Sequence, residues 1–318
     1  MIQKFQFAFA LIITVPTYAE FVVGSVPLDA PTGISTVFAK HVDVYGLHVF
    51  AKSNVSNSKV LHCANILAQW IDNNEDGVVD DLISHQTLVG RYASMLIWAN
   101  PNQADGDYDS IPNSTWDNNG FQELFADEMN LGYPANGQFD WTLEEVLHLV
   151  THEGYALAYP LVWGETSSQM TNTMDAVIAG GWYHYNDPTC DYACKATEYM
   201  YWSLTSLLGA QNYPWRIPDI ADEWELPTPK LMHQHAGSMV QMLQDPQWHI
   251  ATVLPDGTYN PVAPCIADLD GSNDVNVNDL LQLINAWGQS NVSADIDGSG
   301  TVDVGDILLL VDAWGICP

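Results

Sequence analysis

Apolar residues recur at intervals of three and four over most of the chain, which predicts amphipathic helices. A first helix runs from Ser58 to about Asp72, with apolar residues at Val60, Leu61, Ala64, Leu67, Ala68 and Ile71. Further helices are predicted over residues 82–99, 121–130, 142–158, 167–179, 194–208 and 230–243. Strand-like alternation is confined to residues 37–51, where its phase changes at Gly46, so we expect a bulged strand or a short hairpin there. Residues 100–120 read as a surface loop, and the pattern predicts a mainly α fold for a main domain of residues 20–254.

The end of the chain carries one pattern twice. Asp268 and Asp295, 27 positions apart (295 − 268), each open a loop rich in oxygen-bearing side chains, and each loop runs into a short apolar helix that ends in Trp-Gly. Residues 255–264, with three prolines and no apolar periodicity, separate this repeat from the main domain. We therefore predict a linker over residues 255–264 and a small two-repeat EF-hand-like module over residues 265–318.

The two loops place oxygen ligands at the spacing of an EF-hand calcium site. The side chains at loop positions 1, 3, 5, 9 and 12 are Asp268, Asp270, Ser272, Asn276 and Asp279 in the first loop, and Asp295, Asp297, Ser299, Asp303 and Asp306 in the second. Position 7, which binds through its backbone carbonyl, is Asp274 or Thr301. Because neither half can bury a core alone, we expect the module to fold only when it binds calcium.

This repeat resembles a dockerin, the calcium-dependent module of cellulosomal and related secreted proteins. The resemblance covers about the last sixth of the chain, and it implies two Ca²⁺ ions and attachment to a cohesin-like or other surface protein. Dockerins often meet a cohesin through hydroxyl side chains at loop positions 10 and 11, where this chain has Val277-Asn278 and Val304-Gly305. By the same resemblance, the main domain is expected to be an extracellular hydrolase linked to polysaccharide breakdown.

An incomplete version of the same loop follows the first predicted helix, over residues 72–83. Oxygen side chains stand at its positions 1, 3, 5 and 9, which are Asp72, Asn74, Asp76 and Asp80. Gly77 provides the turn at position 6, but position 12 is Ile83, where a bidentate carboxylate belongs. Two interpretations remain open: a third calcium site completed by another residue such as Asp81, or an acidic turn between helices.

The helix predicted over residues 142–158 indicates a second kind of metal chemistry. Glu145, His148 and His152 are spaced so that they share one helix face, and two histidines four apart can bind one zinc ion. This arrangement resembles the zincin metallopeptidase motif His-Glu-x-x-His, and the resemblance implies Glu198 as a third ligand. The chain departs from the motif at Leu149, where zincins carry their general base. Glu145 is the candidate catalytic residue to replace it.

The same residues also have structural explanations. Thr142-x-x-Glu145 fits a capping box, and His148 fits a hydrogen-bonded core histidine. Glu145-x-x-His148 matches one ligand pair of di-iron bundles, although the sequence holds no second pair. The main domain also resembles uncharacterised secreted proteins of marine microbes, from which no activity can be carried over.

The net charge of the chain limits its binding partners, and its N-terminal residues indicate its cellular compartment. With 8 Lys and Arg against 39 Asp and Glu, the formal net charge is −31, which argues against binding to nucleic acid and to anionic membranes. Residues 1–19 fit a secretory signal peptide, because a positive start precedes an apolar run that is too short to span a bilayer. No later segment is apolar enough to cross a membrane. We expect an exported protein.

The five cysteines fit that compartment. Cys265 and Cys317 bracket the C-terminal module and are expected to form a disulfide that closes it. Cys190 and Cys194 lie four apart and either pair locally or bind a metal, whereas Cys63 is expected to be a buried thiol.

Three functions from different classes follow from the sequence. The first is an extracellular hydrolase that the module attaches to a scaffold or surface; a glycosidase would draw its two carboxylates from Glu198, Glu223 and Glu225. The second is a zincin-like metalloprotein that uses His148, His152 and Glu198. The third is a non-catalytic binding or structural protein displayed outside the cell.

Overall fold

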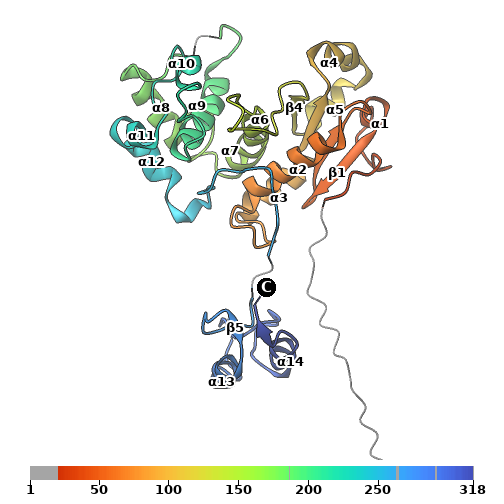
Figure 1. Ribbon diagram of the computed structural model, residues 1–318, viewed down its shortest axis with the longest axis vertical. Coiled ribbons are helices and arrows are strands. Elements are labelled where there is room, and N and C mark those ends of the chain that lie inside the picture. The colour runs from red at the N-terminus through yellow and green to blue at the C-terminus, as the bar shows by residue number, and fades with distance from the viewer. Residues whose placement is uncertain (1–20, 186, 263–264, 291, 318) are drawn as a thin grey trace, which may run out of the picture. The chain divides into compact units, whose positions relative to one another are not determined.

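The structure is a computed structural model that describes residues 21–185, 187–262, 265–290 and 292–317. The signal peptide predicted over residues 1–19 lies outside the described residues. The chain divides into two compact units (Figure 1): a main unit of residues 20–260, and a second unit that contains residues 261–318.

The main unit contains a four-stranded sheet in the order β1-β2-β3-β4. Strands β1 (Lys40–Val44) and β2 (Leu47–Ala51) form an antiparallel hairpin, whose turn places Tyr45 and Gly46 at positive φ. Strands β3 (Ser94–Trp98) and β4 (Phe121–Phe125) then add in parallel. The strand segment predicted over residues 37–51 is therefore present as a hairpin.

The prediction of a mainly α fold is wrong, because β3 and β4 occupy segments that were predicted to be helical. All of Ser94–Trp98 is buried, and the sheet has apolar neighbours on both faces. A strand buried on both faces reads as an unbroken apolar run, which periodicity alone cannot separate from a buried helix. The helix expected over residues 82–99 instead ends at Gly90, and Tyr92 at a φ of 52° turns the chain into β3.

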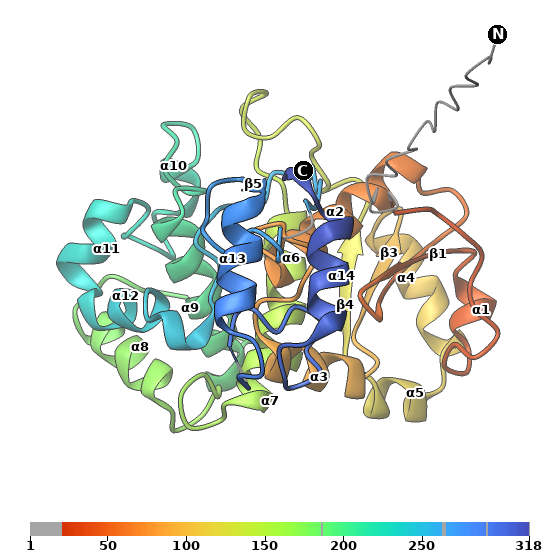
Figure 2. The same cartoon turned by 90° about the horizontal axis from the view of Figure 1, so that it is seen from below.

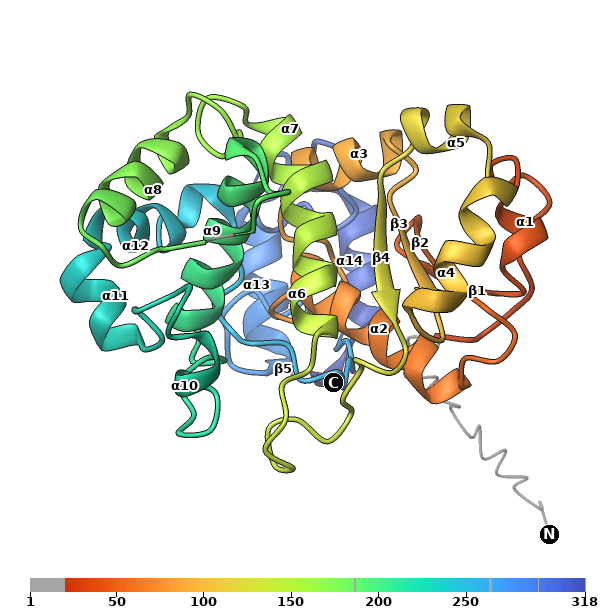
Figure 3. The same cartoon turned by 90° about the horizontal axis from the view of Figure 1, so that it is seen from above.

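Helices cover both faces of this sheet (Figures 1 and 3). Met95 and Ile97 of β3 point into the large core that includes α2 (Asn57–Ile71), whereas Leu96 and Trp98 point into a second core. Short helices border that second core: α1 (Ile34–Val37), α4 (Pro101–Asp107) and α5 (Asn113–Asn118). The last two lie within the segment that was expected to be a surface loop.

The remaining helices gather at the other end of the main unit (Figure 2). They are α8 (Gln169–Ala179), α9 (Tyr192–Leu207), α10 (Ile217–Ile220), α11 (Pro229–His235) and α12 (Gly237–Leu243). Between them and the sheet run α3 (Leu82–Gly90), α6 (Thr142–His148), a π-helix (Leu149–Tyr155) and α7 (Ala156–Ala158). The helix predicted over residues 142–158 is therefore continuous in space but changes type at Leu149.

The second unit has the two-repeat form that the sequence suggests. Helices α13 (Val277–Asn285) and α14 (Val304–Asp312) lie side by side (Figure 2), and the short strands β5 (Asp274–Val275) and β6 (Gly315–Ile316) pair antiparallel. The fully buried apolar residues come from both repeats and are Ala267, Val275, Leu283, Ala294, Val302 and Leu310. The Cys265–Cys317 disulfide joins the two ends of this unit.

Part of the segment that was predicted as a linker belongs to the main unit, where it packs against α2. The Gln69 side chain on α2 accepts hydrogen bonds from the backbone N–H groups of Asp256 (3.1 Å) and Gly257 (2.8 Å). The Tyr259 hydroxyl donates a hydrogen bond to the Asp72 carboxylate. Residues 256–259 are thus fixed to α2 and to the loop that follows it.

Two disulfides are present, Cys190–Cys194 and Cys265–Cys317, and Cys63 is a buried thiol. The first pair lies at the start of α9 and so pairs locally. Among the described residues, no helix is both long and apolar enough to cross a membrane. These features are compatible with an extracellular protein.

Candidate metal centre

Three side chains converge inside the main unit: Glu144 and His148 from α6, and Glu198 from α9. One ligand atom from each lies within 4.8 Å of the other two. Glu144 and His148 are four residues apart, so they project from the same helix face one turn apart. Figure 3 shows α6 between β4 and α9, which is why the face of α6 that meets α9 becomes the wall of a site.

Two of these side chains are buried with polar atoms that have no partner. Glu144 is 8% exposed and His148 is 6% exposed. Among the described residues, neither Glu144 Oε2 nor His148 Nε2 has a hydrogen-bond partner, and His148 Nε2 lies 3.6 Å from Glu198 Oε2. A buried polar atom without a partner is costly, typically by about 1–3 kcal/mol. A cation between these atoms would satisfy both of them.

Burial also shifts the proton equilibria at this point. It raises the pKa of Glu144 well above its ordinary value, and the charges of Glu198 and Glu145 raise it further. Burial, with the charge of Glu145, likewise raises the pKa of Glu198. The pKa of His148 falls to about 4, because burial disfavours the imidazolium. His148 is therefore neutral near pH 7, as a metal ligand must be.

A fourth side chain, Glu145, faces the opposite nitrogen of the histidine. Glu145 Oε2 lies 3.8 Å from His148 Nδ1 and accepts a 2.6 Å hydrogen bond from Gln122 Nε2 on β4. Glu145 is thus held by the sheet and not by a helix cap: the Thr142 side chain makes no capping hydrogen bond, and its hydroxyl has no partner among the described residues. Gln122 could not be found from the sequence, because its segment was predicted to be helical.

Tyr201 and Arg216 support the far side of the site. The Tyr201 ring meets the His148 ring edge to face, with centroids 5.6 Å apart. Its hydroxyl accepts hydrogen bonds from Gln211 Nε2 (3.0 Å) and Arg216 Nη2 (3.4 Å). The Arg216 guanidinium lies 4.2 Å from the centroid of the Phe139 ring. This network fixes the aromatic wall against which His148 packs.

His152 lies outside the cluster, although the sequence placed it beside His148. Its side chain is half exposed, and its Nδ1 lies 2.6 Å from Glu165 Oε1. His152 lies in the π-helix that begins at Leu149, where each turn contains more residues than an α-helical turn. Of the predicted set of His148, His152 and Glu198, the structure brings His148 and Glu198 together and places Glu144, not His152, beside them. A Glu-x-x-x-His spacing was present as a signal for Glu144.

The second unit brings together carboxylates from each of its loops. Asp268, Asp270 and Asp279 form one cluster, and Asp295, Asp297 and Asp306 form the other. Asp279 accepts hydrogen bonds from the backbone N–H groups of Leu269 (2.8 Å), Asp270 (3.1 Å) and Asn276 (2.8 Å). Burial acts to raise the pKa of Asp279, but these backbone N–H groups outweigh it and lower the pKa; the same holds for Asp306.

The other predicted ligands of these loops make local hydrogen bonds. Asn276 and Asp303 cap the N-termini of α13 and α14. The hydroxyls of Ser272 and Ser299 donate to the backbone carbonyls of Asp274 and Thr301, each at 3.2 Å. Asp295 Oδ1 is buried and has no partner among the described residues.

The loop after α2 shares this backbone form but does not gather three carboxylates. As Asp268 does, Asp72 accepts from the N–H groups four and five residues later, which are those of Asp76 (3.1 Å) and Gly77 (2.8 Å). Asp72 also accepts from Tyr259, and Asp80 accepts from the Asn73 N–H group at 2.7 Å. Neutral donors thus take up the oxygens of this loop. In the described part of the chain, Asp72, Asp76 and Asp80 form no group of three carboxylates close enough to hold one metal ion.

Compared with known proteins, the chain matches no protein-family model, no curated protein and no solved structure.

Proposed function

We propose that the main unit is a metal-dependent hydrolase whose ion is bound by Glu144, His148 and Glu198. The observation that carries the proposal is the convergence of these three side chains, two of which present buried atoms without partners. One imidazole and two carboxylates form a donor set that zinc accepts, and three protein ligands leave a position open for water or substrate. When bound, such an ion supplies a Lewis acid that polarises an acyl carbonyl.

The residues of the chain have separate tasks in this proposal. His148 presents Nε2 toward Glu198 and Nδ1 toward Glu145, whose Oε2 lies 3.8 Å from Nδ1. A shorter Nδ1–Oε2 distance in the metal-bound protein would complete the carboxylate–histidine–metal arrangement that fixes a ligand ring and its tautomer. Gln122 holds Glu145 in this position from β4. Burial of Glu144 and His148 keeps water away from two of the three ligands.

The test uses two histidines of one helical segment as a matched pair. We expect purified full-length protein to hold one zinc ion per chain, measured by mass spectrometry of the metal content after dialysis. His148→Ala should lower zinc affinity at least about 100-fold, because it removes a ligand. His152→Ala removes the same side chain outside the cluster and should leave zinc affinity unchanged. Equal losses in the two variants, or no bound transition metal in the native protein, would contradict the proposal.

A second function is proposed for the C-terminal unit: a calcium-folded attachment module. It is supported by the two carboxylate clusters and by the buried Asp295 oxygen without a partner. Large apolar side chains lie exposed at matched positions of the two repeats, namely Val277 and Val304, Leu281 and Leu308, Ile284 and Val311, and Trp287 and Trp314. Exposed apolar surface of this kind is typical of a docking face, which suits a cohesin-like or other surface protein.

A further inference from the structure

A groove with a volume of about 410 Å³ lies along the N-terminal part of α9. Its lining residues are Ile178, Tyr183, His184, Tyr185, Lys195 and Asp222. Tyr183 is buried and anchors the groove wall to α9, because its hydroxyl donates a 2.9 Å hydrogen bond to the Lys195 carbonyl. The groove is therefore formed around one turn of α9.

The groove adjoins the metal centre. Lys195 and Glu198 are three residues apart on α9, so their side chains leave the same face with Cβ atoms about 5–6 Å apart. Tyr185 stands in the same groove wall as Tyr183, with the centroids of the two rings 6.2 Å apart. A molecule that contacts Lys195 in the groove thus lies about one helical turn from Glu198.

Lys195 is unusual among the cations of this acidic protein. Most Lys and Arg side chains of the described residues bind a carboxylate, carbonyl or amide oxygen, as seen for Lys40, Lys52, Lys59, Arg91 and Arg216. Within the same described residues, the ammonium groups of Lys195 and Lys230 have no hydrogen-bond or ion-pair partner. Lys230 is exposed, whereas Lys195 is half-buried at the groove.

The position of Lys195 carries a structural cost as well. It stands at the fourth residue of α9, near the positive end of the helix dipole, where a cation is unfavourable. Among the described residues, no carboxylate lies within 4.0 Å ion-pair distance of Lys195: Asp222 and Glu198 both stay beyond it, and His184 pairs with Glu225 at 3.1 Å. A half-buried cation without a partner, in a chain of net charge −31, indicates a site for an anion.

We propose that Lys195 binds the C-terminal carboxylate of a peptide substrate, with the adjacent peptide bond directed at the metal centre. The inference rests on the proposed function and specifies its substrate class. The Cβ spacing of Lys195 and Glu198 corresponds to between one and two residues of extended peptide, each of which spans about 3.3–3.6 Å. Ile178, which is 40% exposed, and Tyr185 offer an apolar wall for the terminal side chain, which favours a peptide over an acidic sugar.

The experiment measures binding and turnover of two N-acetylated dipeptides by the zinc-loaded full-length protein. The dipeptides share an apolar C-terminal residue but end either in a free carboxylate or in an amide. We expect the carboxylate form to bind roughly 10- to 100-fold more tightly, because a hydrogen bond to a charged group is lost in the amide. Lys195→Met should abolish this difference, and Lys195→Arg should retain most of it.

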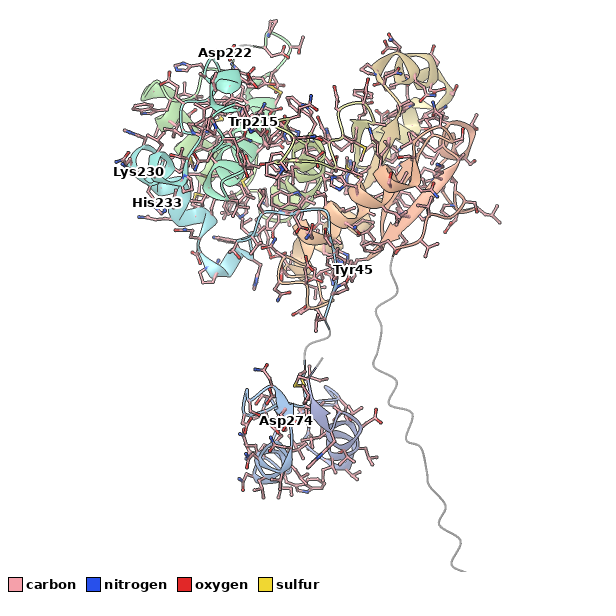
Figure 4. The ribbon with its side chains drawn as sticks, viewed as in Figure 1. Tyr45, Trp215, Asp222, Lys230, His233 and Asp274 are labelled. Carbon is pink, nitrogen blue, oxygen red and sulfur yellow. A yellow bond between two sulfur atoms is a disulfide. The ribbon has the colours of Figure 1, made fainter. Side chains whose placement is uncertain are left out.

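Lys230→Met is the matched control, because it removes the same charge from another cation without a partner. Figure 4 labels Lys230 on α11, well apart from Asp222 of the groove, so this variant should keep the preference for the carboxylate. Equal binding of the two dipeptides overturns the inference, and so does a preference that survives in Lys195→Met. Lys195-dependent binding of an oligouronate, without binding of either peptide, would overturn the peptide assignment in favour of an acidic glycan.

Zinc affinity is measured on the same samples to separate the two proposals. A protein that binds zinc through His148 but shows no carboxylate preference retains the proposed function and loses this inference. A protein that binds no zinc loses the proposed function, while its Lys195-dependent binding of the free-carboxylate peptide remains measurable by calorimetry.

Discussion

The two units of this chain gather carboxylates in contrasting ways. In the C-terminal unit, each cluster comes from one loop of twelve positions, and backbone N–H groups of that loop stabilise the position-12 carboxylates Asp279 and Asp306 in ionised form. In the main unit, the cluster joins α6 to α9 across 50 positions (198 − 148), and its carboxylates have raised pKa values. Backbone donors within one loop thus keep its carboxylates ionised, whereas burial makes the carboxylates that helix packing brings together easier to protonate.

Removal of calcium is expected to have the largest effect, and that effect should be confined to the C-terminal unit. With a chelator that spares zinc, we expect residues 265–317 to lose their protection from hydrogen exchange almost completely, because their core is small and depends on both loops. Asp279→Asn should have the same effect in part. Asp274→Asn is the matched control: Asp274, labelled in Figure 4, is expected to bind only through its backbone carbonyl. Full protection after chelation would contradict the calcium-dependent fold.

Acidification should separate the two kinds of site. A raised pKa means that protons compete with metal at Glu144 and Glu198 from higher pH, so zinc affinity should fall by roughly 100-fold or more between about pH 8 and about pH 5. The lowered pKa values of Asp279 and Asp306 should keep calcium affinity nearly constant over the same range. Titration calorimetry at several pH values measures both. If zinc affinity and calcium affinity change with pH in the same way, the proposed electrostatic difference between the two units is wrong.

The Glu145→Gln variant is expected to lose less zinc affinity than the protein loses on acidification. The variant keeps the shape of the side chain but removes the charge that faces His148 Nδ1, so zinc affinity should fall about 10- to 100-fold. Glu145→Asp should restore part of the loss if the carboxylate itself is required. Glu165→Gln changes a carboxylate that pairs with His152 and should leave zinc affinity unchanged. If Glu145→Gln binds zinc normally, Glu145 does not orient the histidine.

The smallest expected effect concerns the loop after α2, which has the backbone form of the two C-terminal acidic loops but lies in the main unit. Tyr259→Phe removes the hydroxyl that donates to buried Asp72 and should lower the free energy of unfolding by about 1–3 kcal/mol. Chemical denaturation measures this change. A matched Tyr192→Phe variant, which loses a hydrogen bond to exposed Asp175, should change stability by much less. If added calcium restores the stability of Tyr259→Phe, then this loop, too, retains a cation site.

The sequence alone determined those features that depend on contacts between residues close to one another in the chain. The two repeats, their acidic loops, the hairpin over residues 37–51 and the position of α9 follow from spacing and alternation within a few residues. Such features form through local hydrogen bonds and one-sided burial, which leave a regular pattern in the chain. The local pairing of Cys190 with Cys194 was one of the two alternatives that the sequence left open.

Only the tertiary structure decided the rest. Burial on both faces made β3 a strand, and it erased the alternation that would have predicted one. The π-helix after His148 removed His152 from the site, and the packing of α6 against α9 brought Glu144, His148 and Glu198 together. These outcomes depend on contacts between segments that are far apart in the chain, and the spacing of residues within one helix does not show which distant segment the helix will meet.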